Sequence, residues 1–321
     1  RAAAPHQFTP GPLEMPRFSI IVPALNARDL LGLTLDSLRA QTLPDWEAIV
    51  VDDGSTDDTR ELVRAWQALD DRIRLLRTPE AGLAAARNQA ALKAARGSII
   101  AFCDPDDRFV PTKLEQLARA FDAAPVDAIY GQVGFFCKAP GDARGRSVVA
   151  RHPLTIETLL GENPVGPLSN LAIRSSTFRA TVGFDESMDH GADLEWLIPL
   201  VGSGARIEGL PALMTWHRVY KTRRSSDLPA MLAGRARAIS TAQRFGVIPD
   251  ARTEAIHLRS LASCALRQDA GGGEALRLTL RGLSHSPRAF LSPSRKGVSV
   301  MVGSLGAIVL PRPLRQALFW T

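Results

Sequence analysis

Four short runs of β-forming residues, each followed by a helical pattern, occupy the chain between Arg17 and Ala124. The runs are Phe18–Val22, Trp46–Val51, Ile73–Leu76 and the apolar stretch after Gly97. Parallel strands cannot be joined by tight hairpins and need long crossover segments, which are usually helices. The sequence therefore predicts a doubly wound, mostly parallel α/β sheet flanked by helices.

Two of these runs end in carboxylates. Asp52 and Asp53 close the second run, and Asp104, Asp106 and Asp107 follow the fourth. The carboxyl ends of parallel strands share one edge of the sheet, where ligands of open α/β sheets bind. Clustered acids repel one another unless a cation or donors compensate, and hard oxygen ligands suit Mg²⁺ or Mn²⁺ together with substrate phosphates. We therefore predict a metal and a phosphate-bearing ligand at this edge.

Helix capping is the alternative interpretation of these acids. Asp106 or Asp107 would then cap the helix that Pro111 opens, since acids before a helix stabilise its first turn. The helix after the second run has a similar signal, because Ser55 is a suitable cap and acids follow it.

The strict alternation ends after Ala124. Strands are predicted near 127–136, 170–174 and 206–219, and helices near 155–160 and 189–202. The pattern is helical from Pro229 to Arg267 and again from Glu274 to Leu283. We expect a disordered leader over residues 1–16, a catalytic domain over 17–225 and a helical C-terminal region over 226–321. The catalytic domain would divide into a nucleotide-binding half, 17–125, and an acceptor half, 126–225.

The charge of the chain is asymmetric. Its formal net charge is +6, and the excess of Lys and Arg lies mostly after residue 140. Such a balance fits a phosphate-rich ligand, an anionic acceptor or an acidic membrane surface, and does not by itself indicate nucleic acid, which we do not expect as a partner. Three widely spaced cysteines favour a reducing compartment, so we expect a cytoplasmic protein.

Several motifs together resemble a known family. They are Phe18–Asn26, Gln41–Asp57, Gly82–Asn88 and Asp104–Asp107. In this order and spacing they look like a family 2 glycosyltransferase of GT-A fold, closely over residues 17–125 and more loosely to residue 220. The resemblance implies an inverting enzyme that uses a nucleotide-diphosphate sugar, UDP-linked by preference, with Mg²⁺ or Mn²⁺.

The resemblance also implies roles for residues of the nucleotide half. Pro23 with its neighbours Ala24 and Asn26, together with Asp53, matches the positions that hold the nucleobase. Arg87 matches an arginine near the base and ribose. Taken one at a time, these residues have simpler interpretations as a strand terminator, a turn residue and a solvated helix charge.

The four residues Asp104–Asp107 match the DxD motif of the family. The resemblance directs Asp104 toward the ribose and Asp106 toward the metal, with both acids as metal ligands and the adjacent Asp107 as a further candidate. Pro105 in the middle position departs from the usual pattern, but a proline that stiffens the turn does not remove a ligand.

Asp193 is the candidate general base. It lies near the start of a predicted helix and is similar to the second acid of the family's acidic pair, whose first acid is Ala192 here. Asp189 and Glu195 are rivals for this role. In the alternative interpretation, Asp193 is a first-turn acid that favours the helix dipole.

The segment 216–226 resembles the loop that closes over the donor phosphates. His217 is a candidate diphosphate or metal contact, and Arg218, Arg223 and Arg224 are candidates for the phosphates or an anionic acceptor. A solvated basic loop and an ordinary core histidine are the alternatives.

The region 289–318 mixes apolar and basic residues. It would dock on an anionic membrane at the inner face of the cell, pack on the catalytic domain, or form an oligomer contact; packing is the expectation we favour.

The predicted function is metal-assisted, inverting transfer of a sugar to a hydroxyl of a glycan, a lipid-linked glycan or another acceptor. A nucleotidyltransferase is one alternative, but it calls for a Gly-rich basic loop directly after the first strand, where this chain has Val22–Asn26. The other alternative is a protein that binds a nucleotide sugar without catalysis. It is suggested by Ala192, which replaces the first acid of the family's acidic pair.

Overall fold

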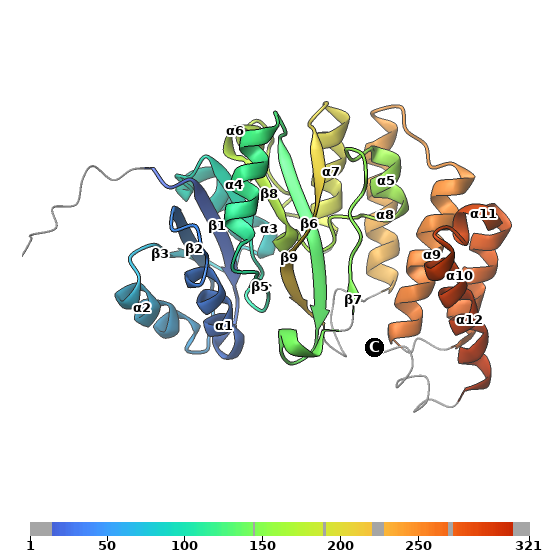
Figure 1. Ribbon diagram of the computed structural model, residues 1–321, viewed down its shortest axis with the longest axis horizontal. Coiled ribbons are helices and arrows are strands. Elements are labelled where there is room, and N and C mark those ends of the chain that lie inside the picture. The colour runs from blue at the N-terminus through green and yellow to red at the C-terminus, as the bar shows by residue number, and fades with distance from the viewer. Residues whose placement is uncertain (1–14, 144, 189–190, 220–227, 269–271, 311–321) are drawn as a thin grey trace, which may run out of the picture.

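A single mixed sheet organises the fold. The computed structural model describes residues 15–143, 145–188, 191–219, 228–268 and 272–310. The sheet order is β3-β2-β1-β4-β8-β6-β9-β5, with β7 paired to β6 (Figure 1). Most of the expected leader, residues 1–14, lies outside the described residues.

The first half of the sheet is parallel, as the alternation of strands and helices predicts. Its strands are β1 (Phe18–Ala24), β2 (Trp46–Asp53), β3 (Ile73–Thr78) and β4 (Ile99–Phe102). Pairing of Ala24 with Asp52 and of Asp53 with Thr78 brings the ends of β1, β2 and β3 to one edge. Every residue of β1, β2 and β4 is buried, as expected for strands covered on both faces.

The second half of the sheet is mixed. Its strands are β5 (Arg108–Phe109), β6 (Ala128–Phe136), β7 (Gly145–Arg146), β8 (Leu171–Arg174) and β9 (Ile207–Arg218). β8 runs antiparallel to β4 and β6, whereas β6 and β9 are parallel. The short β5 pairs with the end of β9, so Asp104–Asp107 lie in the turn between β4 and β5.

Helices cover both faces of the sheet. One apolar core lies beneath α1 (Arg28–Arg39), α2 (Thr59–Leu69) and α4 (Lys113–Ala123). The other lies beneath α3 (Leu83–Asn88), α5 (Ile156–Gly161), α6 (Ser175–Arg179), α7 (Ala192–Gly202) and α8 (Leu228–Gln243). Ile20 and Ile21 belong to different cores because successive strand residues point to opposite faces.

The C-terminal helices form a separate apolar cluster at the end of the molecule away from β3 and α2 (Figure 1). They are α9 (Ala251–Gln268), α10 (Gly272–His285), α11 (Pro287–Phe290) and α12 (Ser294–Val309). α8 differs from them, because Ala238 and Ala242 are buried in the core beside the sheet. The change in packing therefore falls between α8 and α9, while the domain boundary at 225/226 stays a prediction.

Both capping interpretations are wrong. α2 begins at Thr59, whose amide donates to the carboxylate of Asp57 at 3.0 Å, whereas Ser55 lies three residues before the cap position, Asp58. α4 begins at Lys113 after Thr112, which makes no side-chain cap bond, so neither Asp106 nor Asp107 caps it. In addition, α3 continues into a π-helical turn, Gln89–Ala94.

Candidate functional site

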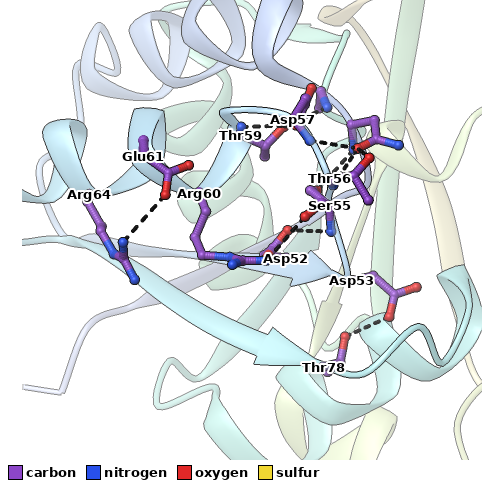
Figure 2. Close-up of polar contacts among 12 residues, drawn as sticks. Asp52, Asp53, Ser55, Thr56, Asp57, Thr59, Arg60, Glu61, Arg64 and Thr78 are labelled. Carbon is purple, nitrogen blue, oxygen red and sulfur yellow. Dashed lines mark hydrogen bonds and ion pairs between the residues drawn. The ribbon is translucent and has the colours of Figure 1, made fainter.

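The loops after β1 and β2 are tied together by side chains. Asn26 has a φ of 49°, and its Oδ1 accepts bonds from the amides of Thr56 and Asp57 at 2.8 and 3.3 Å. Asp52, at the end of β2, accepts a bond from Arg60 Nε at 2.8 Å. Figure 2 shows both side chains. Asn26 and Asp52 thus hold the edge of the sheet in shape, and contact of Asn26 with a nucleobase stays a prediction.

Asp53 organises the loop that leads into α3. Its Oδ1 accepts bonds from Thr78 Oγ1 and the Ala81 amide, both at 2.8 Å, and its Oδ2 accepts one from the Gly82 amide at 2.9 Å. Figure 2 shows Thr78 reaching Asp53 from the neighbouring strand. The side chain is almost fully buried, as are Pro23 and Ala24 at the end of β1. Contact of these three residues with a donor base stays a prediction.

Arg87 joins α3 to the end of β4. Its Nη2 donates to Asp104 Oδ1 at 2.7 Å, and its guanidinium lies 6.0 Å from the centre of the Phe184 ring. Its Nε is buried and has no hydrogen-bond partner among the described residues. An arginine held in this way presents a fixed positive charge to an anionic ligand.

Asp193, in the first turn of α7, lies within electrostatic reach of this pair. Burial raises the pKa of its carboxyl above the ordinary value, and the negative charge of Asp104 acts in the same direction. The Leu194 amide and the positive charge of Arg87 oppose the rise. Glu195, its rival, points elsewhere and accepts a bond from Thr241 of α8. The other rival, Asp189, lies outside the described residues.

The turn Asp104–Asp107 is anchored from two sides. Thr34 of α1 donates to the carbonyls of Pro105 and Asp107 at 2.9 and 2.8 Å. The carboxylate of Asp107 is fully buried and lies 2.9 Å from His217 Nδ1. Burial opposes ionisation of Asp107, but His217 and hydrogen bonds around it keep the pKa of its carboxyl below the ordinary value. Asp107 therefore positions His217, which lies at the end of β9 and not in a solvated loop; its predicted contact with a diphosphate or a metal stays a prediction.

Lys113 and Ser169 hold the turn Asp104–Asp107 through hydrogen bonds. The Asp104 amide donates to Ser169 Oγ at 2.9 Å, and Lys113 Nζ donates to the Ser169 carbonyl at 2.6 Å and to Thr215 Oγ1 at 3.0 Å. Lys113 is fully buried, and burial lowers the pKa of its ammonium from 10.5 to about 7. Sequence reasoning missed both residues, because nothing in a single sequence links positions 104, 113 and 169.

The guanidinium of Arg218 is held by residues at the end of β6. Its Nη1 donates to the carbonyls of Cys137 and Lys138 at 2.8 and 3.0 Å, and its guanidinium packs 4.6 Å from the centre of the Phe136 ring. These contacts tie β9 to the end of β6. Its predicted contact with donor phosphates stays a prediction, and Arg223 and Arg224 lie outside the described residues.

The carboxylate oxygens of Asp104 and Asp106 suit a hard divalent cation that a bound ligand also coordinates. Within the part of the chain that the structure describes, no cluster of three or more acids, histidines or cysteines could enclose a metal ion. Mg²⁺ bound with substrate phosphates needs only one or two carboxylates, because phosphates and water complete its shell. Asp104, whose Oδ1 is bound to Arg87, and Asp106 beside it meet this requirement.

The comparison with known families decides the classification. The sequence model of the family described as glycosyl transferase family 2 matches residues 19–180, from the start of β1 to the residue after α6. The chain belongs to glycosyl transferase family 2. The matched segment includes Asp53, Arg87 and Asp104–Asp107, and stops short of Asp193 and His217.

Curated relatives of this family 2 chain are bacterial proteins named as glycosyltransferases. It is 43% identical over 102 residues to the putative teichuronic acid biosynthesis glycosyltransferase TuaG of Bacillus subtilis, covering 32% of this chain and 40% of TuaG. It is 38% identical over 113 residues to the Escherichia coli UDP-Glc:alpha-D-GlcNAc-diphosphoundecaprenol beta-1,3-glucosyltransferase WfgD, covering 35% of this chain and 44% of WfgD. The matches thus span less than half of either relative.

Solved structures agree with the fold over most of the chain. TarS of S. aureus in complex with UDP has a TM-score of 0.57 at 19% identity and covers 90% of both chains. The mannosyltransferase PcManGT of Pyrobaculum calidifontis, solved with GDP-Man and Mn²⁺, has a TM-score of 0.56 at 21% identity and covers 94% of this chain and 90% of PcManGT. These likenesses confirm the GT-A type fold predicted from the sequence.

Proposed function

We propose that this family 2 chain is an inverting glycosyltransferase that moves a sugar from a nucleotide-diphosphate sugar to an acceptor hydroxyl. The observation that carries the proposal is the ion pair of Arg87 and Asp104 at the carboxyl edge of the parallel strands, with the carboxyl of Asp193 near enough for the charges of both to act on its pKa. One fixed cation, one turn of acids and one carboxylate with a raised pKa are what a reaction with an anionic leaving group and a proton acceptor needs.

Asp104 and Asp106 would hold Mg²⁺ or Mn²⁺ together with the donor diphosphate. A divalent cation bound there would offset the negative charge that develops on the departing diphosphate. Arg87 would add a second positive charge close to Asp104 and the ribose. Asp107 would keep His217 directed at the phosphate side of the site, since its buried carboxylate holds Nδ1 of the ring.

Asp193 would take the proton of the acceptor hydroxyl as the new glycosidic bond forms. Its carboxylate would stand on the acceptor side of the sugar, so the hydroxyl would attack from the face opposite the diphosphate and invert the anomeric carbon. A raised pKa makes this carboxylate a stronger proton acceptor than a solvated aspartate.

We propose a UDP-sugar as the donor and a glycan or a lipid-linked glycan as the acceptor. We choose a UDP-sugar because TarS was solved with UDP. PcManGT was solved with GDP-Man, so the test also includes GDP-sugars. The acceptor assignment draws on WfgD, whose name describes a diphosphoundecaprenol-linked sugar. Such an acceptor would place the enzyme at the inner face of the cell membrane.

A panel of UDP- and GDP-sugars tests the proposal by thermal stabilisation with and without Mn²⁺, because a ligand of the native state raises its melting temperature. Asp106→Ala should abolish the metal-dependent stabilisation. Asp193→Asn should retain it and lower kcat by about 10²–10⁴-fold, the range expected for loss of a general base.

Two outcomes contradict the proposal. Absence of metal-dependent stabilisation by every UDP- and GDP-sugar removes the donor assignment, and normal transfer by Asp193→Asn removes the assigned base. Release of nucleoside diphosphate separates a transferase from a protein that only binds the donor, and release of pyrophosphate from a nucleoside triphosphate would indicate a nucleotidyltransferase instead.

A further inference from the structure

Helix α12 has most of its large aliphatic side chains on the outside. Its buried positions are Gly297, Val300, Gly303, Ser304 and Ala307. Its exposed aliphatic positions are Val298 (43%), Val302 (57%), Leu305 (52%), Ile308 (55%) and Val309 (83%). A helix on the surface of a protein in water normally has the opposite arrangement, with large apolar residues inward and polar residues outward.

The inner face of α12 is covered by neighbouring helices. The helix packs on α9 and α10, and Thr279 Oγ1 of α10 lies 2.8 Å from Ser304 Oγ in this interface. At its start, a Cβ on Gly297 would lie 2.4 Å from Leu291 Cα, so the helix and the segment after α11 are in direct backbone contact. The inner face is therefore buried among the C-terminal helices, and the outer face is not covered by the described residues. Packing on the catalytic domain, the expectation we favoured from the sequence, stays a prediction.

The outer face is one continuous stripe. Val298, Val302, Leu305 and Val309 recur at intervals of four, three and four residues, so they lie on one side of the helix. The helix has 16 residues and is therefore about 24 Å long. No described helix combines the length and apolarity needed to cross a bilayer. The stripe therefore suits a helix that lies flat along an interface.

The chain segment that contains this stripe carries charges of a single sign. From Ala275 to Thr321 the sequence contains no Asp or Glu, and its basic residues are Arg277, Arg281, Arg288, Arg295, Lys296, Arg312 and Arg315. Arg281 of α10, Arg288 of α11 and Arg295 of α12 are exposed. None of these three has an ion pair with another described residue. Arg295 lies one turn before Val298 and so borders the stripe.

We propose that the outer face of α12 binds the surface of an anionic lipid bilayer. Its aliphatic stripe would enter the boundary between headgroups and acyl chains, and Arg281, Arg288 and Arg295 would meet lipid phosphates. Small residues inside and large aliphatic residues outside are the arrangement of a helix packed on protein in contact with lipid. A second copy of the chain fits less well, because the segment from Ala275 onward would bring basic residues and no Asp or Glu of its own to both sides of the contact.

Sedimentation of the full chain with vesicles tests this surface. The vesicles are made of phosphatidylcholine alone or mixed with phosphatidylglycerol, without donor or acceptor sugar. The chain should pellet with the mixed vesicles and much less with the neutral ones, and added salt should weaken binding.

Two sets of variants measure separately the apolar and the ionic contributions to vesicle binding. The double variant Val302→Gln/Leu305→Gln should lower binding on the order of a hundredfold, because each exposed aliphatic contributes about tenfold when buried. The triple variant Arg281→Gln/Arg288→Gln/Arg295→Gln should lose about fivefold per cation and its preference for phosphatidylglycerol. The matched control is Leu69→Gln/Val182→Gln, which replaces two exposed aliphatics elsewhere (66% and 95%) and should bind as the wild type does.

The proposal is overturned if the wild-type chain stays in the supernatant with phosphatidylglycerol vesicles. It is also overturned if the chain is a dimer by light scattering, Leu305→Gln makes it a monomer, and vesicle binding does not change; the stripe would then belong to a second copy. Failure here leaves the transferase proposal standing, because vesicle binding is measured without any sugar.

Discussion

Three carboxylates within four positions have different environments, although their spacing makes them look equivalent. Asp107 is fully buried against His217, whereas Asp104 is partly exposed and paired with Arg87. Because environment sets the charge state and availability of an acid, Asp107 acts as a support and Asp104 remains available at the edge of the sheet. Neighbours in the turn therefore differ in their surroundings: Asp107 supports the turn, and ligand binding by Asp104 stays a proposal.

The pH dependence of turnover should report Asp193. Burial raises the pKa of its carboxyl from 3.8, and a general base works only when it is deprotonated. We therefore expect kcat to fall as the pH decreases through a pKa above that of an ordinary aspartate. The measurement is kcat against pH at saturating donor and acceptor, with the melting temperature followed at each pH.

The low-pH decrease should disappear in the residual activity of Asp193→Asn and persist in Asp185→Asn, a control acid exposed on the segment before α7. A wild-type profile whose low-pH decrease has the pKa of a solvated carboxylate would contradict the assignment.

At the scale of elements, the loops of the nucleotide half are built by side chains rather than by tight turns alone. Asn26 connects the loops after β1 and β2, and Asp53 connects β2 and β3 to the start of α3. α3 carries Arg87, so the position of the positive charge at the site depends on a carboxylate two elements away. A loop residue can therefore change donor binding without touching the donor.

Asp53→Ala tests this dependence. The substitution leaves the Ala81 and Gly82 amides without their acceptor, which should cost about 1–3 kcal/mol of the free energy of unfolding. We also expect weaker donor binding, because Arg87 loses its fixed position. Denaturant unfolding and calorimetric titration with the donor measure the two effects.

Asp58→Ala is the matched control, because Asp58 is an exposed acid of the neighbouring loop whose bond is to Arg28 on the surface. An Asp53→Ala protein as stable as Asp58→Ala would show that the loop does not need this carboxylate.

Across the whole molecule, one acid joins the C-terminal helices to the sheet domain. Glu162, directly after α5, pairs with Arg259 of α9 at 3.1 Å and with Lys296 of α12. Burial opposes ionisation of Glu162, but Lys296 and Arg259 outweigh it and keep the pKa of its carboxyl below 4.5. The helix that carries the aliphatic stripe is thus linked to the residue after α5 by an ion pair.

Glu162→Gln should reduce the free energy of unfolding by about 1–3 kcal/mol at neutral pH, the range for hydrogen bonds to charged groups. The folded-state pKa is lowered, so the stabilisation is present above pH 4.5 and is lost as the pH falls through the lowered pKa. The difference between wild type and variant should therefore shrink in acid. Denaturant unfolding at several pH values measures it.

Glu157→Gln, on the exposed side of the same helix, is the control and should leave stability nearly unchanged. A constant difference between Glu162→Gln and wild type down to the acid limit would contradict the ionic origin.

Local patterns were sufficient for the parallel half of the fold. β1, β2, β3 and β4 follow the four apolar runs, and the helices after them follow the apolar periodicity, because strand and helix patterns depend on neighbouring residues. Helix starts were less predictable. Ser55 is a suitable cap by residue type, yet α2 begins four residues later, since the loop is held by Asn26 from another element.

The sequence by itself determined the α/β alternation, the acids at the strand ends and the family, since each depends on residues close together in the chain. Tertiary structure alone decided which partner each acid meets. Asp107 binds His217 across 110 positions, and Asn88 binds Phe184 across 96. It also decided which side of α12 faces outward. Contacts over such separations depend on how the elements pack, and packing is a property of the whole chain that no local pattern contains.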